Sequence, residues 1–178
     1  MKPAFVLALL AGCQLPVRTG VTAPTRHGFG GVAGQLVIGG TGTKDLRSVR
    51  IGGGGIVTIT GNATALAVQT GPQAHADFVV RKMSRGREFV LATRIDAGFG
   101  RVFSDSTTDE KSTYSFGAFV GPGLAYAPKN TTSGQTWTTV ALGVTAQRIT
   151  IDDRSAWFVG AALELAYGPD FASLGGSR

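Results

Sequence analysis

The chain has 178 residues, a net charge of +6, 43% hydrophobic residues and only 16% charged ones. Its length fits one domain, its charged fraction lies below the usual ~25% of soluble proteins, and its single cysteine excludes an internal disulfide. The positive charge would suit nucleic acid, but an aromatic-interleaved basic strand of the RNA-binding type is missing, so we expect no nucleic-acid partner.

The first twelve residues have the pattern of an export signal. Lys2 follows the initial methionine, an apolar and uncharged run covers residues 4–10, and the small residues Ala11 and Gly12 come next. Such a run is far shorter than the ~20 residues of a membrane-spanning helix but fits the ~7–15 residues of a signal-peptide core. We therefore predict a signal peptide over residues 1–12.

The segment LAGC, which ends at Cys13, resembles the bacterial lipoprotein signal, the lipobox. In that family the thiol receives a diacylglyceryl group and becomes the first residue of the mature chain. The resemblance implies a covalent lipid on Cys13, with no other cofactor, and Gln14 after it implies sorting to the outer membrane of a Gram-negative cell. An ordinary secretory signal is the alternative, with residues 21–23 as a weaker cleavage site; a catalytic Cys13 lacks a partner motif.

Apolar periodicity begins after the N-terminal segment. Residues 13–28 are rich in proline, threonine and basic residues without a period, which predicts a lipid-anchored tether. From Phe29 onward apolar residues recur at every second position, as in β-strands. We predict a β-barrel over residues 29–168 and a C-terminal tail over residues 169–178.

Three segments alternate most clearly, and each apolar face begins and ends on an aromatic residue. The end pairs are Phe89 and Phe99, Tyr114 and Tyr126, and Trp157 and Tyr167. Their spacing of about ten residues matches the ~9–11 residues with which a tilted strand crosses a bilayer, and aromatic rings favour the headgroup boundary. These six residues are therefore predicted to form the aromatic girdles of a membrane barrel.

Weaker alternation bounded by turn residues completes the predicted sheet. The weaker strands cover residues 30–38, 47–60, 63–70, 75–83 and 135–150, and turns are expected at Gly61-Asn62, Gly71-Pro72, Ser84-Arg85-Gly86 and Asp152-Asp153. Residues 101–112 are expected to form the longest loop. The fold class predicted is all-β: an antiparallel up-and-down β-barrel of about eight strands.

This strand pattern resembles the small OmpA/OmpX-type outer-membrane barrels between Phe29 and Tyr167. The resemblance implies a non-enzymatic outer-membrane protein with a structural or surface-interaction role. Membrane lipid is the expected partner, with other envelope proteins or lipopolysaccharide as further ones, and the oligomeric state stays open.

Period two alone does not say which face points inward. The alternative is a periplasm-facing, lipid-anchored soluble barrel or sandwich that binds a small apolar ligand or supports envelope assembly, and a third hypothesis is a narrow ion or solute channel. Opposite the apolar faces lie mainly glycine and alanine with few charges, which suits a narrow lumen better than a surface in water.

Charged residues share the faces opposite the apolar ones. They are His75, Asp77, Arg81, Glu88, Arg94, Asp96 and Glu164. Buried charges are costly unless paired, so we predict a salt-bridge network that plugs the lumen, with a gated polar pathway as the sharper alternative. Neither a metal site nor a catalytic site is predicted, because the two histidines have no ligand-spaced partners and a G-x-S-x-G elbow is missing.

Overall fold

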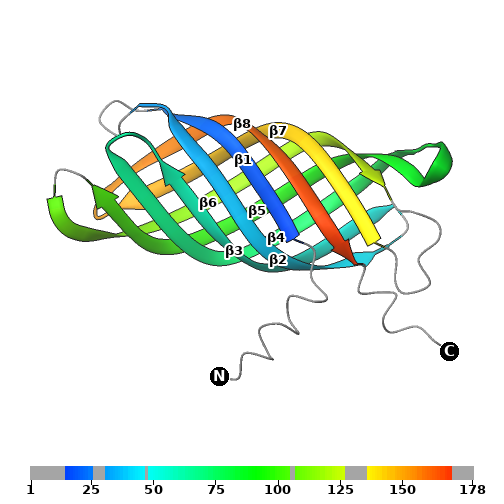
Figure 1. Cartoon of the computed structure of the whole chain (residues 1–178), viewed down its shortest axis with the longest axis horizontal. Helices are drawn as coiled ribbons and strands as arrows, with labels where there is room; N and C mark the ends of the chain where they lie inside the picture. The colour runs from blue at the N-terminus through cyan, green and yellow to red at the C-terminus, as the bar shows by residue number, and fades with distance from the viewer. Residues whose placement is uncertain (1–14, 26–30, 47, 105–106, 127–135, 170–178) are drawn as a thin grey trace, which may run out of the picture.

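The computed structural model describes residues 15–25, 31–46, 48–104, 107–126 and 136–169, which form eight antiparallel strands closed into one barrel (Figure 1). The strands are β1 (Leu15–Pro24), β2 (Ala33–Asp45), β3 (Val49–Gly61), β4 (Ala65–Lys82), β5 (Arg87–Ser104), β6 (Thr107–Tyr126), β7 (Thr136–Ile151) and β8 (Arg154–Pro169), with one short 3-10 turn, η1 (Ser84–Gly86), before β5. Consecutive strands pair, and β1 also pairs with β8. The predicted fold class is confirmed.

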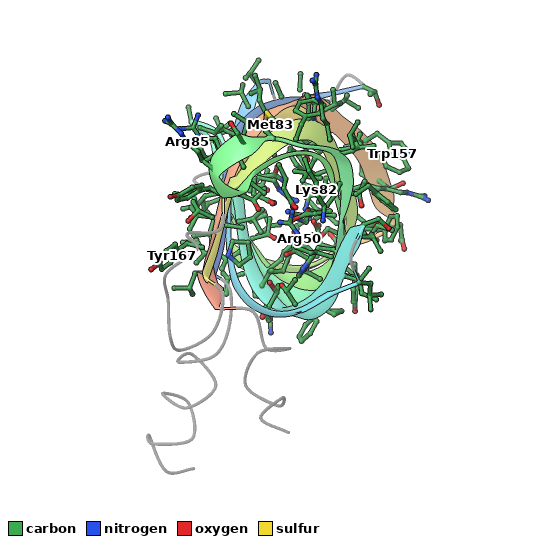
Figure 2. The ribbon with its side chains drawn as sticks, turned by 90° about the vertical axis from the view of Figure 1, so that its right-hand side faces the viewer. Arg50, Lys82, Met83, Arg85, Trp157 and Tyr167 are labelled. Atoms are coloured by element: carbon green, nitrogen blue, oxygen red, sulfur yellow. The ribbon has the colours of Figure 1, made fainter. Side chains whose placement is uncertain are left out.

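The outside of the barrel is apolar. All six predicted girdle residues are exposed on it, and Figure 2 shows Trp157 and Tyr167 pointing away from the wall. Between the aromatic ends of the strands the outer face carries exposed aliphatic side chains, such as Ile95, Leu142 and Leu163. A soluble barrel around an apolar ligand needs these faces inside, so the structure contradicts that arrangement.

The inside of the barrel is polar. The largest fully buried side chains include Arg18, Arg50, Gln69, Gln147 and Glu164. Alanines and a few larger apolar residues fill the space between them. Successive side chains of a strand point to opposite faces, so the same alternation that makes the outer surface apolar delivers these polar groups to the lumen.

The predicted tether is wrong over most of its length, because β1 occupies residues 15–24. Arg18 pairs in register with Val37 of β2 and with Glu164 of β8. The alternation in β1 is difficult to recognise because the strand is short and has a proline near each end. Cys13 and the predicted signal peptide lie outside the described residues, as does the tail beyond Pro169.

The turn predicted at Gly71-Pro72 is also wrong, because β4 is one strand of 18 residues. Thr70 pairs with Phe99 and Gln73 with Asp96, so the ladder with β5 resumes in the same register after the proline. Proline lacks the N–H of a ladder bond, and the long paired stretches on both sides outweigh that single loss. Two predicted strands are therefore one.

The loop predicted over residues 101–112 is replaced by a hairpin. Arg101 pairs with Ser112 and Ser104 with Thr107, which extends β5 and β6 through the segment predicted to be a loop. Figure 1 shows this hairpin projecting at one end of the barrel and the β4–β5 hairpin at the other. We call the end where β1 begins and β8 ends the terminal end, and the opposite end the distal end.

The other turns are confirmed. Asn62 Oδ1 accepts hydrogen bonds from the backbone N–H groups of Thr64 and Ala65, both at 3.0 Å. Arg85 and Asp152 adopt left-handed backbone conformations, with φ of 61° and 51°, within the tight connections before β5 and β8. These short connections allow only antiparallel pairing of the strands they join.

The role of β1 can be tested by truncation. A chain that begins at Cys13 keeps the whole of β1, whereas a chain that begins at Thr25 leaves β2 and β8 without the partner that closes the ring. We expect the first chain to refold in detergent micelles into a species whose gel mobility changes on heating. The second should not do so, and an equal heat-dependent shift in both chains would contradict the need for β1.

Candidate functional site

Five charged side chains from four strands form a continuous network in the middle of the lumen. Arg18 Nη2 of β1 donates to Asp96 Oδ2 of β5 at 2.6 Å. Arg94, also on β5, donates from Nη1 to Asp77 Oδ1 of β4 at 2.6 Å and from Nε to Glu164 Oε1 of β8 at 2.7 Å. Arg18 Nη1 lies 3.9 Å from Glu164 Oε2, which joins the two halves.

This central network crosses the lumen. Strands β1 and β5 lie opposite each other in the ring of eight, so the pair of Arg18 and Asp96 spans the diameter of the barrel. Both side chains are at most 3% exposed. The Arg18 guanidinium also lies over the Phe119 ring, 5.5 Å from its centre, within the range of a cation–π contact. Ion pairs and an aromatic ring therefore fill the cross-section here.

A second group of contacts lies toward the terminal end. Arg50 Nη2 of β3 donates to Glu88 Oε2 of β5, and Lys82 Nζ lies 3.9 Å from Glu88 Oε1. Thr43 Oγ1 and His75 Nε2 are 3.0 Å apart. In Figure 2, which views the barrel from this end, Arg50 points into the lumen. Glu88 is thus held by two cations close to the mouth.

Side-chain amides and hydroxyls fill the lumen toward the distal end. Gln35 Nε2 of β2 donates to Gln147 Oε1 of β7 at 2.9 Å, and Gln147 Nε2 reaches Gln69 Oε1 of β4 at 3.4 Å. Gln69 Nε2 in turn donates to Thr113 Oγ1 of β6 at 3.0 Å. This amide cluster connects four strands across the lumen without a formal charge.

Of the seven predicted lumen residues, the structure places His75, Asp77, Glu88, Arg94, Asp96 and Glu164 inside, buried or nearly so. Arg81 lies outside, which contradicts its predicted place. Val79 pairs with Val90 but Arg81 pairs with Phe89, so Val80 is the extra residue of a β-bulge. One extra residue reverses the alternation, and Arg81 joins the exposed outer face beside Phe89.

Sequence reasoning missed Arg18, Arg50 and the three glutamines of the amide cluster. Arg18 lay in the segment interpreted as a tether, although Val17, Thr19 and Val21 alternate with it there. The glutamines carry no charge, so a prediction based on charged residues of the inner faces does not include them. A search for any large polar residue opposite an apolar face would have found all five.

The network is suited to holding strands together. Its carboxylates are bound by arginine through charge-assisted hydrogen bonds, the strong class of protein hydrogen bond. Within the described ranges of the chain, a cluster of three or more histidine, cysteine, aspartate or glutamate residues fit for a metal does not occur. The described residues include no helix long and apolar enough to cross a membrane.

Comparison with known proteins adds little. No family model matches the sequence, and no curated protein matches it. Among solved structures, a mutant of the porin of Rh. blastica is matched at 10% identity over 90% of this chain and 99% of that chain, with a TM-score of 0.14. A TM-score this low does not establish a shared fold, so the site is interpreted from its own geometry.

Removal of Arg94 should destabilise the barrel. Arg94→Met leaves Asp77 and Glu164 without their shared cation in the lumen, and breaking a buried ion pair from one side costs about 3–5 kcal/mol. The matched control is Arg81→Met, because Arg81 is an exposed arginine on β4, the strand that pairs with the strand of Arg94. Urea unfolding in detergent should show a large loss for Arg94→Met only; equal losses would show that the network contributes little.

Proposed function

We propose that this chain is a non-enzymatic outer-membrane protein whose barrel spans the bilayer and serves a structural or surface-interaction role. The observation that carries the proposal is the inverted polarity of the wall. Arginine, glutamate and glutamine are buried in the lumen, while valine, leucine, isoleucine and aromatic side chains are exposed all around the outside. Soluble monomers rarely expose an apolar surface this continuous.

The dimensions of the outer surface support the membrane assignment. The strands have 10 to 20 residues, at least the ~9–11 residues that a tilted strand needs to cross the bilayer. Exposed aromatic residues lie toward both ends, with Trp157 and Phe99 toward the distal end and Tyr167 and Phe89 toward the terminal end. An apolar band between two aromatic girdles is the pattern of outer-membrane barrels.

The contents of the lumen favour a plug over a channel. The ion pair of Arg18 with Asp96 crosses the diameter, and the amide cluster crosses the lumen again toward the distal end. A conducting pore needs a continuous path of water or weak ion sites. We infer that the role of this polar interior is to tie opposite strands together, and that interaction with other molecules takes place on the outer wall and at the ends.

The lipid anchor on Cys13 belongs to this proposal. Cys13 precedes the first residue of β1 by two positions, so a signal removed before Cys13 leaves the closing strand whole. Cleavage after Ala23 would remove nearly all of β1 and open the ring. The closure of the barrel therefore favours the lipoprotein signal over the secretory alternative, and the anchor would lie at the terminal end.

Extraction tests whether the strands hold the protein in the membrane. We would express a Cys13→Ala variant with a cleavable secretory signal and wash the outer membranes with alkaline carbonate and with urea. We expect the variant to stay in the membrane pellet as a heat-modifiable species, because the apolar wall is its anchor. Release of folded variant into the supernatant would refute the membrane-spanning barrel and leave the lipid as the anchor.

A substitution in the middle of the outer wall gives a second test. Ala161 is exposed on β8, four residues after Trp157 and six before Tyr167, near the middle of the outer face. An arginine at the bilayer midplane costs about 2–4 kcal/mol in such barrels, so Ala161→Arg should lower the free energy of unfolding in lipid vesicles by about that amount. Ala161→Leu is the size control and should be nearly neutral. If both variants match the unsubstituted protein, this face does not contact lipid.

A further inference from the structure

A groove of about 690 Å³ opens on the outer wall near the distal end, over strands β3 to β6. Such a volume lies within the range of ~300–1,000 Å³ that is usual for small-molecule sites. Most of the lining is apolar: Val57, Val68, Phe99, Phe103 and Tyr114 contribute side chains. Arg101 is the one charged residue among the lining residues that the structure describes.

The order of side chains along the groove places Arg101 between two aromatic residues of β5, Phe99 and Phe103. Phe99 of β5 pairs in register with Tyr114 of β6, and Arg101 pairs with Ser112. Residues two apart on a strand differ by about 6.6 Å along it. The polar pair of Arg101 and Ser112 therefore lies one step nearer the distal end than the aromatic pair, and Phe103 of β5 lies one step beyond it.

The floor of the groove has few polar side-chain groups that are available to bind a ligand. Gln69 and Thr113 are among its lining residues, but their side chains point into the lumen, where Gln69 Nε2 donates to Thr113 Oγ1 at 3.0 Å, and both residues are at most 1% exposed. Of the described lining residues, Arg101 supplies the positive charge, beside the exposed hydroxyl groups of Ser112 and Tyr114. A guanidinium has five N–H donors, so a contact of Arg101 with its own chain still leaves donors for a ligand.

We propose that this groove binds an anionic phospholipid, with an acyl chain against Val57, Phe99 and Tyr114 and the phosphate at Arg101. The inference rests on the proposed function, because the groove meets lipid only if the barrel spans the bilayer. Charge complementarity carries the choice of ligand: guanidinium matches the geometry of phosphate oxygens and binds them through charge-assisted hydrogen bonds. Arg101 lies between the exposed Phe99 and Phe103, and aromatic residues at the ends of a membrane barrel mark headgroup depth.

Selectivity at this site should come from the headgroup. Lipid tails are as apolar as the side chains that line the groove, so contacts with an acyl chain alone do not make the groove prefer one lipid over the bulk lipid. Phosphatidylcholine carries a compensating cation in its headgroup, whereas phosphatidylglycerol does not. The site should therefore enrich phosphatidylglycerol over phosphatidylcholine from an equal mixture.

The test measures this enrichment by native mass spectrometry of protein released from nanodiscs with equal amounts of the two lipids. Loss of one charge-assisted contact should lower the enrichment of phosphatidylglycerol about fivefold or more in Arg101→Gln. Arg148→Gln is the matched control, because Arg148 is an exposed arginine on β7 that does not line the groove and donates to Ser155. It should keep the enrichment of the unsubstituted protein.

Three outcomes would overturn the proposal: no enrichment in the unsubstituted protein, unchanged enrichment in Arg101→Gln, or an equal loss in both arginine variants, which would indicate general basicity. Glycerol phosphate, the headgroup without chains, should fail to displace the lipid; displacement would show a site for free phosphate. The nanodisc itself separates the two hypotheses. Protein that does not insert refutes the membrane barrel, whereas inserted protein without selectivity refutes only the lipid site.

Discussion

The pairing of β1 with β8 is the contact on which the rest of the structure depends. A backbone N–H or C=O that faces hydrocarbon without a partner costs several kcal/mol, and only a closed sheet satisfies every strand from both sides. Ten register pairs, from Leu15 with Tyr167 to Pro24 with Phe158, complete that closure. An apolar outer wall becomes tolerable in lipid only because this last ladder leaves no open edge between the first and last strands.

Closure of the barrel also determines which charged side chains pair inside the lumen. A ring of eight strands encloses a space just wide enough for side chains to fill, so charged groups on the inner faces must find one another across it. Arg18 reaches Asp96 on the opposite strand, and Arg94 reaches both Asp77 and Glu164. Each pair offsets a desolvation cost that closure itself imposes. The network therefore depends on the barrel: an open sheet would keep the contact of Arg94 with Asp77 on the neighbouring strand, but it would separate Arg18 from Asp96 and Arg94 from Glu164.

The predicted strand number came out right through two opposite errors. Residues 15–24 were interpreted as a tether because their prolines and threonines mask a short alternation, although β1 is the closing strand. Residues 65–82 were divided at Pro72, because proline usually ends a strand, although the ladder with β5 continues on both sides of it. Local turn signals mislead in a barrel when long flanking ladders outweigh one missing hydrogen bond.

The sequence by itself determined the all-β class, the alternation and most of the inward charges, because the period of two assigns every residue of a regular strand to one of two faces. Only the tertiary structure decided which face is the lumen, which arginine meets which carboxylate, and where Arg81 lies. Those outcomes depend on the register between strands and on one extra residue at Val80. Register is set by partners far apart in the chain, so a local pattern does not contain it.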